Sequence, residues 1–155
     1  MARPLPSLFD EYGESHRNSV NVTVHWIAVP LIYFSITGLL MCIPSPRNEY
    51  LDRYLWALLA LLVVWLYYAS RSLSISIGMA IFSVACVAIA TWLDVHAPWP
   101  LWAISIGIFV LAWIAQFIGH AIEGKKPGFL KDLLFLMIGP AWLMAKLYRR
   151  IGIPY

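Results

Sequence analysis

Three of the four histidines in this sequence, His16, His25 and His120, have neighbours that suit metal binding. Glu123 follows His120 by three residues, so an imidazole and a carboxylate share one face of a helix there. Two or more histidines with a carboxylate and open coordination positions suit non-haem Fe(II) and its oxygen chemistry. Helical bundles with di-iron centres use Glu and His at the same spacing. The residue types therefore predict a metal site.

Amide side chains close to these histidines are candidates to orient them. Asn21 lies four residues before His25, and Asn18 lies one turn further upstream. Gln116 lies four residues before His120, again on the same helical face. A neutral imidazole binds metal through one nitrogen, and a neighbouring amide can hold the other nitrogen. We expect the three amides to act in this way, with ordinary hydrogen bonds between helices as the alternative.

The nine-residue spacing of His16 and His25 requires an interruption in the helix. In a continuous helix the two side chains would point to opposite faces, about 13.5 Å apart along the axis. Asn18 and Asn21 favour caps and turns over helix interiors. We therefore predict a non-helical residue or a sharp bend between Arg17 and Asn21, with Asn21 or a neighbour capping the helix that follows.

Membrane helices are the elements that must position these residues. Hydrophobic residues make up 61% of the chain and charged residues 12%, whereas soluble domains have about 45–50% and 25%. A soluble fold of 155 residues would need to bury more apolar surface than so small a body can hide. The net charge of +3 suits anionic lipid headgroups. Nucleic-acid binding is excluded because no basic stripe with interleaved aromatic residues is present.

Gaps between the charged residues mark the predicted helices. A membrane crossing takes about 20 apolar residues, and backbone amides cannot face lipid unpaired, so the fold is all-α. We expect one transmembrane domain over 1–155, with spans near 22–43, 54–70, 73–93 and 99–120. A short amphipathic helix is expected at Ser7–Arg17. Leu133–Ala145 is short and contains Gly139-Pro140, so we expect an interfacial or re-entrant helix there.

The positions of the cations predict the orientation in the membrane. With four spans, nine of the 11 Lys and Arg residues fall on one side, and such a bias places both termini in the cytoplasm. The three histidines and Glu123 then lie at the cytoplasmic face. His96 lies in the opposite loop, about 30 Å away. Lys125 and Lys126 would contact lipid headgroups, or alternatively the carboxylate of a substrate.

Two longer patterns resemble the signatures of the small membrane 2-hydroxy fatty acid dioxygenases, a family that acts in fatty-acid α-oxidation. The likeness covers nearly the whole chain in order and length, although Lys146 stands where an acidic residue is common. The first pattern is Tyr12-x3-His16-x-Asn18-x2-Asn21-x3-His25, followed by Val29-Pro30-Leu31. The second is Trp113-x2-Gln116-Phe117-Ile118-Gly119-His120-x2-Glu123-Gly124-x2-Pro127, and Gly139-Pro140 resembles a later signature.

This resemblance implies an Fe(II)-dependent dioxygenase that uses O2 to shorten a 2-hydroxy fatty acid by one carbon. His16, His25 and His120 would be the ligands, and Glu123 would be a further ligand or a neighbour of the ligands. The protein would cross the inner membrane of a bacterium or, in a eukaryote, the endoplasmic reticulum. Two alternatives remain open: a zinc-dependent membrane lipid hydrolase, and a non-enzymatic bundle with haem between His25 and His120 or with no cofactor.

Overall fold

The computed structural model describes residues 5–45, 54–124 and 129–155, with the backbone alone for 129–136. Within these ranges the chain forms helices and no strands, which confirms the all-α prediction. The helices are α1 (Leu5–Gly13), α2 (Ser19–Met41), α3 (Leu55–Ala69), α4 (Leu73–His96), α5 (Leu101–Glu123) and α6 (Phe129–Ile151).

Three of the described helices, α2, α4 and α5, are long and apolar enough to cross a membrane. Helix α3 is apolar but has only 15 residues, so its crossing stays a prediction. Large apolar side chains remain exposed on the outer faces, among them Val84 at 69% and Leu111 at 68%. Such exposure suits lipid and would promote aggregation in water. The predicted integral membrane bundle is thereby confirmed, and the ends of α2, α3, α4 and α5 lie within three residues of those of the predicted spans.

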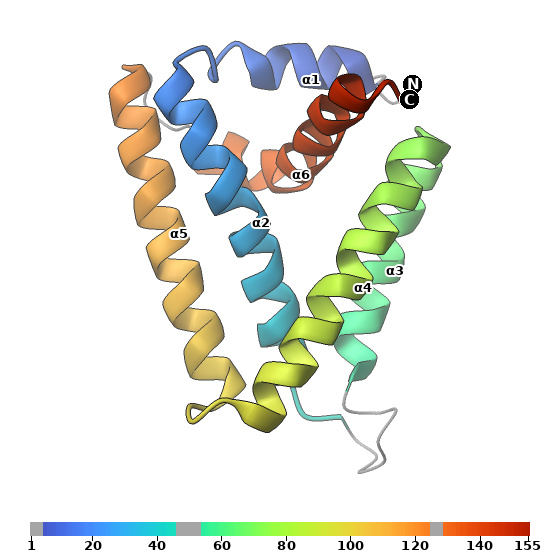
Figure 1. Ribbon diagram of the computed structural model, residues 1–155, viewed down its shortest axis with the longest axis vertical. Helices are drawn as coiled ribbons and strands as arrows, with labels where there is room; N and C mark the ends of the chain where they lie inside the picture. Colours follow the sequence, from blue (N-terminus) through green and yellow to red (C-terminus); the bar gives the residue numbers. More distant parts are fainter. Residues whose placement is uncertain (1–4, 46–53, 125–128) are drawn as a thin grey trace.

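Helices α2, α3, α4 and α5 form a V whose arms separate toward one end (Figure 1). Helices α2 and α5 form one arm, and α3 and α4 form the other. At the open end, α1 lies across the top and α6 lies beneath it, between the arms. Helix α2 contacts α3, α4, α5 and α6, so it is the central element of the bundle.

Small residues allow α2 and α5 to approach closely. A side chain added at Gly38 of α2 would place its Cβ 2.4 Å from Oγ of Ser105. A Cβ atom added at Gly119 of α5 would lie 2.5 Å from Oδ1 of Asn21. Glycine and serine at such contacts are typical of helix pairs in membranes. The antiparallel pairing brings the start of α2 beside the end of α5, where the histidines lie.

The two peripheral helices differ in length from the predicted ones. Helix α1 ends at Gly13 instead of continuing to Arg17, and Leu5, Phe9 and Tyr12 form its buried face. Helix α6 continues through Pro140 and extends beyond the predicted Leu133–Ala145 at both ends. Tertiary packing explains the difference, because residues of α6 such as Trp142 belong to the same buried apolar cluster as Leu5 and Phe9.

Candidate metal centre

The segment between α1 and α2 turns His16 back toward His25. Helix α2 begins at Ser19, and the side-chain oxygen of Asn18 caps it by accepting a hydrogen bond from the backbone N–H of Val20 at 2.9 Å. The predicted interruption and cap are therefore confirmed. As a result, the ring centroids of His16 and His25 lie 4.3 Å apart.

His120, from the end of α5, completes a cluster of three buried imidazoles. Its ring centroid lies 5.2 Å from that of His16 and 5.0 Å from that of His25. One ring nitrogen from each residue lies within 4.8 Å of the other two. The exposed fractions of the side chains are only 7%, 1% and 6%, respectively. Nitrogen–metal distances near 2 Å are compatible with this spacing.

Backbone carbonyls orient two of the imidazoles. Nδ1 of His16 lies 2.6 Å from the carbonyl oxygen of Tyr12, and Nδ1 of His25 lies 2.9 Å from that of Asn21. A carbonyl only accepts, so each Nδ1 carries the proton and each Nε2 keeps its lone pair. Nε2 of His16 is buried without a hydrogen-bond partner among the described residues. Because buried polar atoms are rarely left unpaired, this nitrogen fits a metal ion.

The surroundings of His16 also favour the neutral form that metal binding requires. Burial lowers the pKa of His16 from 6.5 to about 4, against the opposing effect of its hydrogen bond to Tyr12. The nearby His120 and Lys146 lower the pKa further, while Glu123 raises it. His16 is therefore uncharged at neutral pH, and no proton must be displaced when a metal binds.

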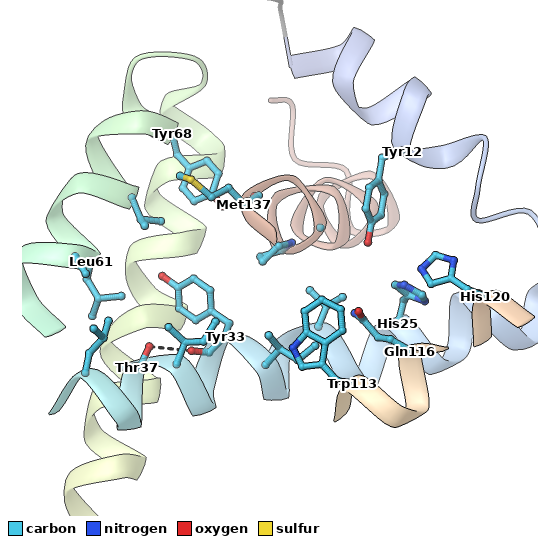
Figure 2. Close-up of a pocket in the computed structure, with 18 residues that line it drawn as sticks. Tyr12, His25, Tyr33, Thr37, Leu61, Tyr68, Trp113, Gln116, His120 and Met137 are labelled. Atoms are coloured by element: carbon cyan, nitrogen blue, oxygen red, sulfur yellow. Dashed lines mark hydrogen bonds between the residues drawn. The ribbon is translucent and has the colours of Figure 1, made fainter. Parts of the chain in front are cut away.

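A cavity of about 130 Å³ extends from the histidines into the bundle. Figure 2 shows His25, His120 and Gln116 at one end of this cavity, and Thr37 and Leu61 at the other. Side chains from α1, α2, α3, α5 and α6 form the walls, and most of them are apolar or aromatic. The arrangement places polar groups and a potential metal at one end of an apolar chamber, as in many small-molecule sites.

Comparison with known proteins identifies the family of the chain. The family model described as 2-hydroxy-palmitic acid dioxygenase Mpo1-like matches residues 2–151. The chain belongs to the Mpo1-like family. It is similar to the 2-hydroxy-palmitic acid dioxygenase MPO1 of Saccharomyces cerevisiae, with 26% identity over 150 residues, which cover 96% of this chain and 82% of the yeast protein. No solved structure matches the chain.

In this member of the Mpo1-like family, Glu123 lies outside the histidine cluster. Its carboxylate accepts hydrogen bonds from the backbone N–H groups of Arg17, at 3.0 Å, and Asn18, at 2.9 Å. It also accepts one from the side-chain amide of Asn21, at 3.1 Å. A carboxylate is well placed at the start of a helix, where unpaired N–H groups point outward. Glu123 therefore joins the end of α5 to the start of α2.

The three predicted amides have different surroundings. Asn18 caps α2, and Nδ2 of Asn21 donates to the carbonyl oxygen of Ser15 at 3.2 Å as well as to Glu123. Asn21 thus holds the backbone next to His16, and Asn18 fixes the start of α2. Gln116 lines the cavity beside the histidines (Figure 2).

The remaining candidates lie apart from the cluster or outside the described residues. His96 is exposed at the far end of α4, where it stacks on Trp92 with ring centroids 5.0 Å apart. Lys125 and Lys126 lie outside the described residues.

The contacts of aromatic residues with His16 were not predicted from the sequence, although Tyr12 begins the first pattern. Tyr12 stacks on the His16 ring at a centroid distance of 4.0 Å, and Trp142 of α6 lies at 5.5 Å. Nζ of Lys146 lies 3.6 Å from the centroid of the Trp142 ring. The four-residue spacing of Tyr12 and His16 is a signal that could have indicated the first contact. Trp142 comes from a distant segment, and its contact depends on the tertiary fold.

Proposed function

We propose that the protein is an Fe(II)-dependent dioxygenase that shortens 2-hydroxy fatty acids by one carbon with O2. The main support is the buried cluster of His16, His25 and His120 at one end of an apolar cavity. Nitrogen ligands with open positions suit Fe(II) and O2. The substrate class follows from the name of the yeast relative, a 2-hydroxy-palmitic acid dioxygenase.

The three histidines would hold the iron, which when bound supplies positions for O2 and for the hydroxyl and carboxylate groups of the substrate. The protein's own residues contribute in other ways. The carbonyls of Tyr12 and Asn21 orient two of the imidazoles, and the burial of the cluster limits the access of water. Lys125 and Lys126 would attract the substrate carboxylate by charge.

Metal analysis and turnover of anaerobically purified protein test this proposal. Alanine at His16, His25 or His120 should abolish the turnover of 2-hydroxypalmitic acid and lower the iron content. His96→Ala is the matched control and should retain both, because that side chain is exposed and packs on Trp92.

Three other results would contradict the proposal and identify an alternative. Stoichiometric zinc with O2-independent lipid hydrolysis would identify a hydrolase. A Soret band would identify a haem protein. Protein that binds no metal under anaerobic conditions would be a scaffold.

A further inference from the structure

The cavity follows one face of α2 over most of the length of that helix. The residues of α2 that line it include His25, Val29, Ile32, Ile36 and Leu40. These positions recur every three or four residues, so they form a single stripe. Leu40 lies 15 positions after His25, which corresponds to about 22 Å at a rise of 1.5 Å per residue. The cavity wall is therefore long in one direction, with a histidine at one end.

The deep part of the cavity presents an apolar surface although hydroxyl groups lie within it. Oγ1 of Thr37 donates to the carbonyl oxygen of Tyr33 at 3.0 Å. The hydroxyl of Tyr33 pairs with that of Ser83 at 2.7 Å, and the hydroxyl of Tyr68 donates to the carbonyl oxygen of Met137. Since these groups already have partners, the deep part favours a hydrocarbon occupant over a polar one.

The other end of the cavity differs in polarity. His25, His120 and Gln116 gather there (Figure 2). Trp113, which lies between the two ends, has a buried Nε1 with no hydrogen-bond partner in the described part of the chain. The difference in polarity between the two ends of the cavity matches an occupant that has polar atoms at one end and a long apolar remainder.

The length of the stripe also fits such an occupant. The hydrocarbon core of a bilayer is about 30 Å thick, so the acyl chains of one leaflet extend about 15 Å. A cavity that follows this stripe for about 22 Å is therefore long enough for the tail of a long-chain fatty acid beside α2.

Residues of α3 meet the end of this stripe. Leu40 lies at the end of the stripe farthest from His25, and Ala60 and Leu61 line the cavity from the half of α3 nearest its start. Figure 2 shows Leu61 at the end opposite the histidines. We propose that the cavity holds the acyl tail of the substrate and that Leu40, Ala60 and Leu61 set the longest tail accepted. This inference rests on the proposed function.

Filling the deep end tests the inference. Ala60→Phe should lower kcat/KM for 2-hydroxystearic acid by about tenfold or more and leave 2-hydroxydecanoic acid within about twofold, since single methylene groups in apolar pockets change selectivity by such factors. Ala88→Phe makes the same change on an exposed part of α4 and should leave the chain-length profile unaltered.

Enlarging the deep end provides a second variant should Ala60→Phe fail to fold. Leu61→Ala should shift the preference toward longer chains, whereas Leu62→Ala, at a side chain that is 50% exposed, should not. An unchanged profile in Leu61→Ala, or in folded Ala60→Phe, would overturn the inference while the proposed function stands.

A binding measurement separates the two proposals. Unreactive straight-chain fatty acids of the same lengths should stabilise the detergent-purified protein against heat, and Ala60→Phe should remove the stabilisation by the longest ones. If this length dependence appears but the wild-type protein turns over no 2-hydroxy fatty acid, the tail site is supported and the proposed function fails. Equal stabilisation of the wild type and Ala60→Phe by every chain length would overturn the tail site.

Discussion

At the scale of single residues, Glu123 contacts the start of α2 through both carboxylate oxygens. These oxygens accept hydrogen bonds from Arg17, Asn18 and Asn21. A side chain in this position supports the histidine cluster through the backbone, because the same segment carries His16. Ligation by Glu123 would instead require its oxygens to face the three imidazoles.

Substitution of Glu123 distinguishes these two roles. Glu123→Gln keeps one acceptor oxygen for the backbone N–H groups, so we expect most of the iron to be retained and the free energy of unfolding to fall by about 1 kcal/mol or less. Glu123→Ala should have a clearly larger effect on both quantities. Iron content and thermal unfolding are the measurements. If both variants lose iron as completely as His120→Ala does, Glu123 is a ligand.

The clustering of the three histidines could be predicted from the sequence because their local signals are strong. Asn18 lies between His16 and His25, and an asparagine there both breaks and caps a helix. The surroundings of Glu123 could not be predicted, since its partners are more than 100 residues away in the chain. Sequence spacing alone places Glu123 beside His120 and does not show which neighbouring helix its carboxylate contacts.

At the scale of helices, the close contact of α2 and α5 depends on Gly38. The Cβ of any other residue at this position would approach Ser105 within 2.4 Å. Gly38→Val should lower the free energy of unfolding by about 1–3 kcal/mol, as overpacking usually does, and should reduce iron retention because the pair also positions His25 and His120. Thermal unfolding and metal analysis check both effects.

Gly107 of α5 supplies the matched control. A Cβ at this position meets no atom within 4 Å, so Gly107→Val should leave iron retention close to that of the wild type. Equal losses in Gly38→Val and Gly107→Val would show that the helix pair does not depend on this close approach.

The lengths of α1 and α6 show where prediction from the sequence fails for helices. The gaps between charged residues located α2, α4 and α5 to within three residues, because lipid imposes a similar length on every crossing helix. Helices α1 and α6 pack on one another at the open end of the V (Figure 1). The first and last residues of both helices depend on that contact. A local pattern such as Gly139-Pro140 carries no information about it.

For the whole molecule, the distribution of Lys and Arg predicts that both termini face the cytoplasm. A cysteine introduced by Tyr155→Cys, in a background with Cys42→Ser, should react with a membrane-impermeant reagent only after the membrane is permeabilised. His96→Cys in the same background, at an exposed side chain that the same prediction places on the opposite face, should react in intact cells and serves as the control. Labelling of position 155 from outside would contradict this orientation.

The central position of α2 has a consequence for how cells make this protein. Synthesis begins at the N-terminus, so α2 leaves the ribosome before the helices that bury Asn21, His25 and Ser35. Its mean hydropathy of 1.7 is below the 2.3 of α4 and the 2.2 of α5. Until translation reaches α5, the polar groups of a newly made α2 must therefore contact the insertion machinery or water instead of lipid. Only then do His25 and His120 meet, so the proposed metal can bind only at a late stage of biogenesis.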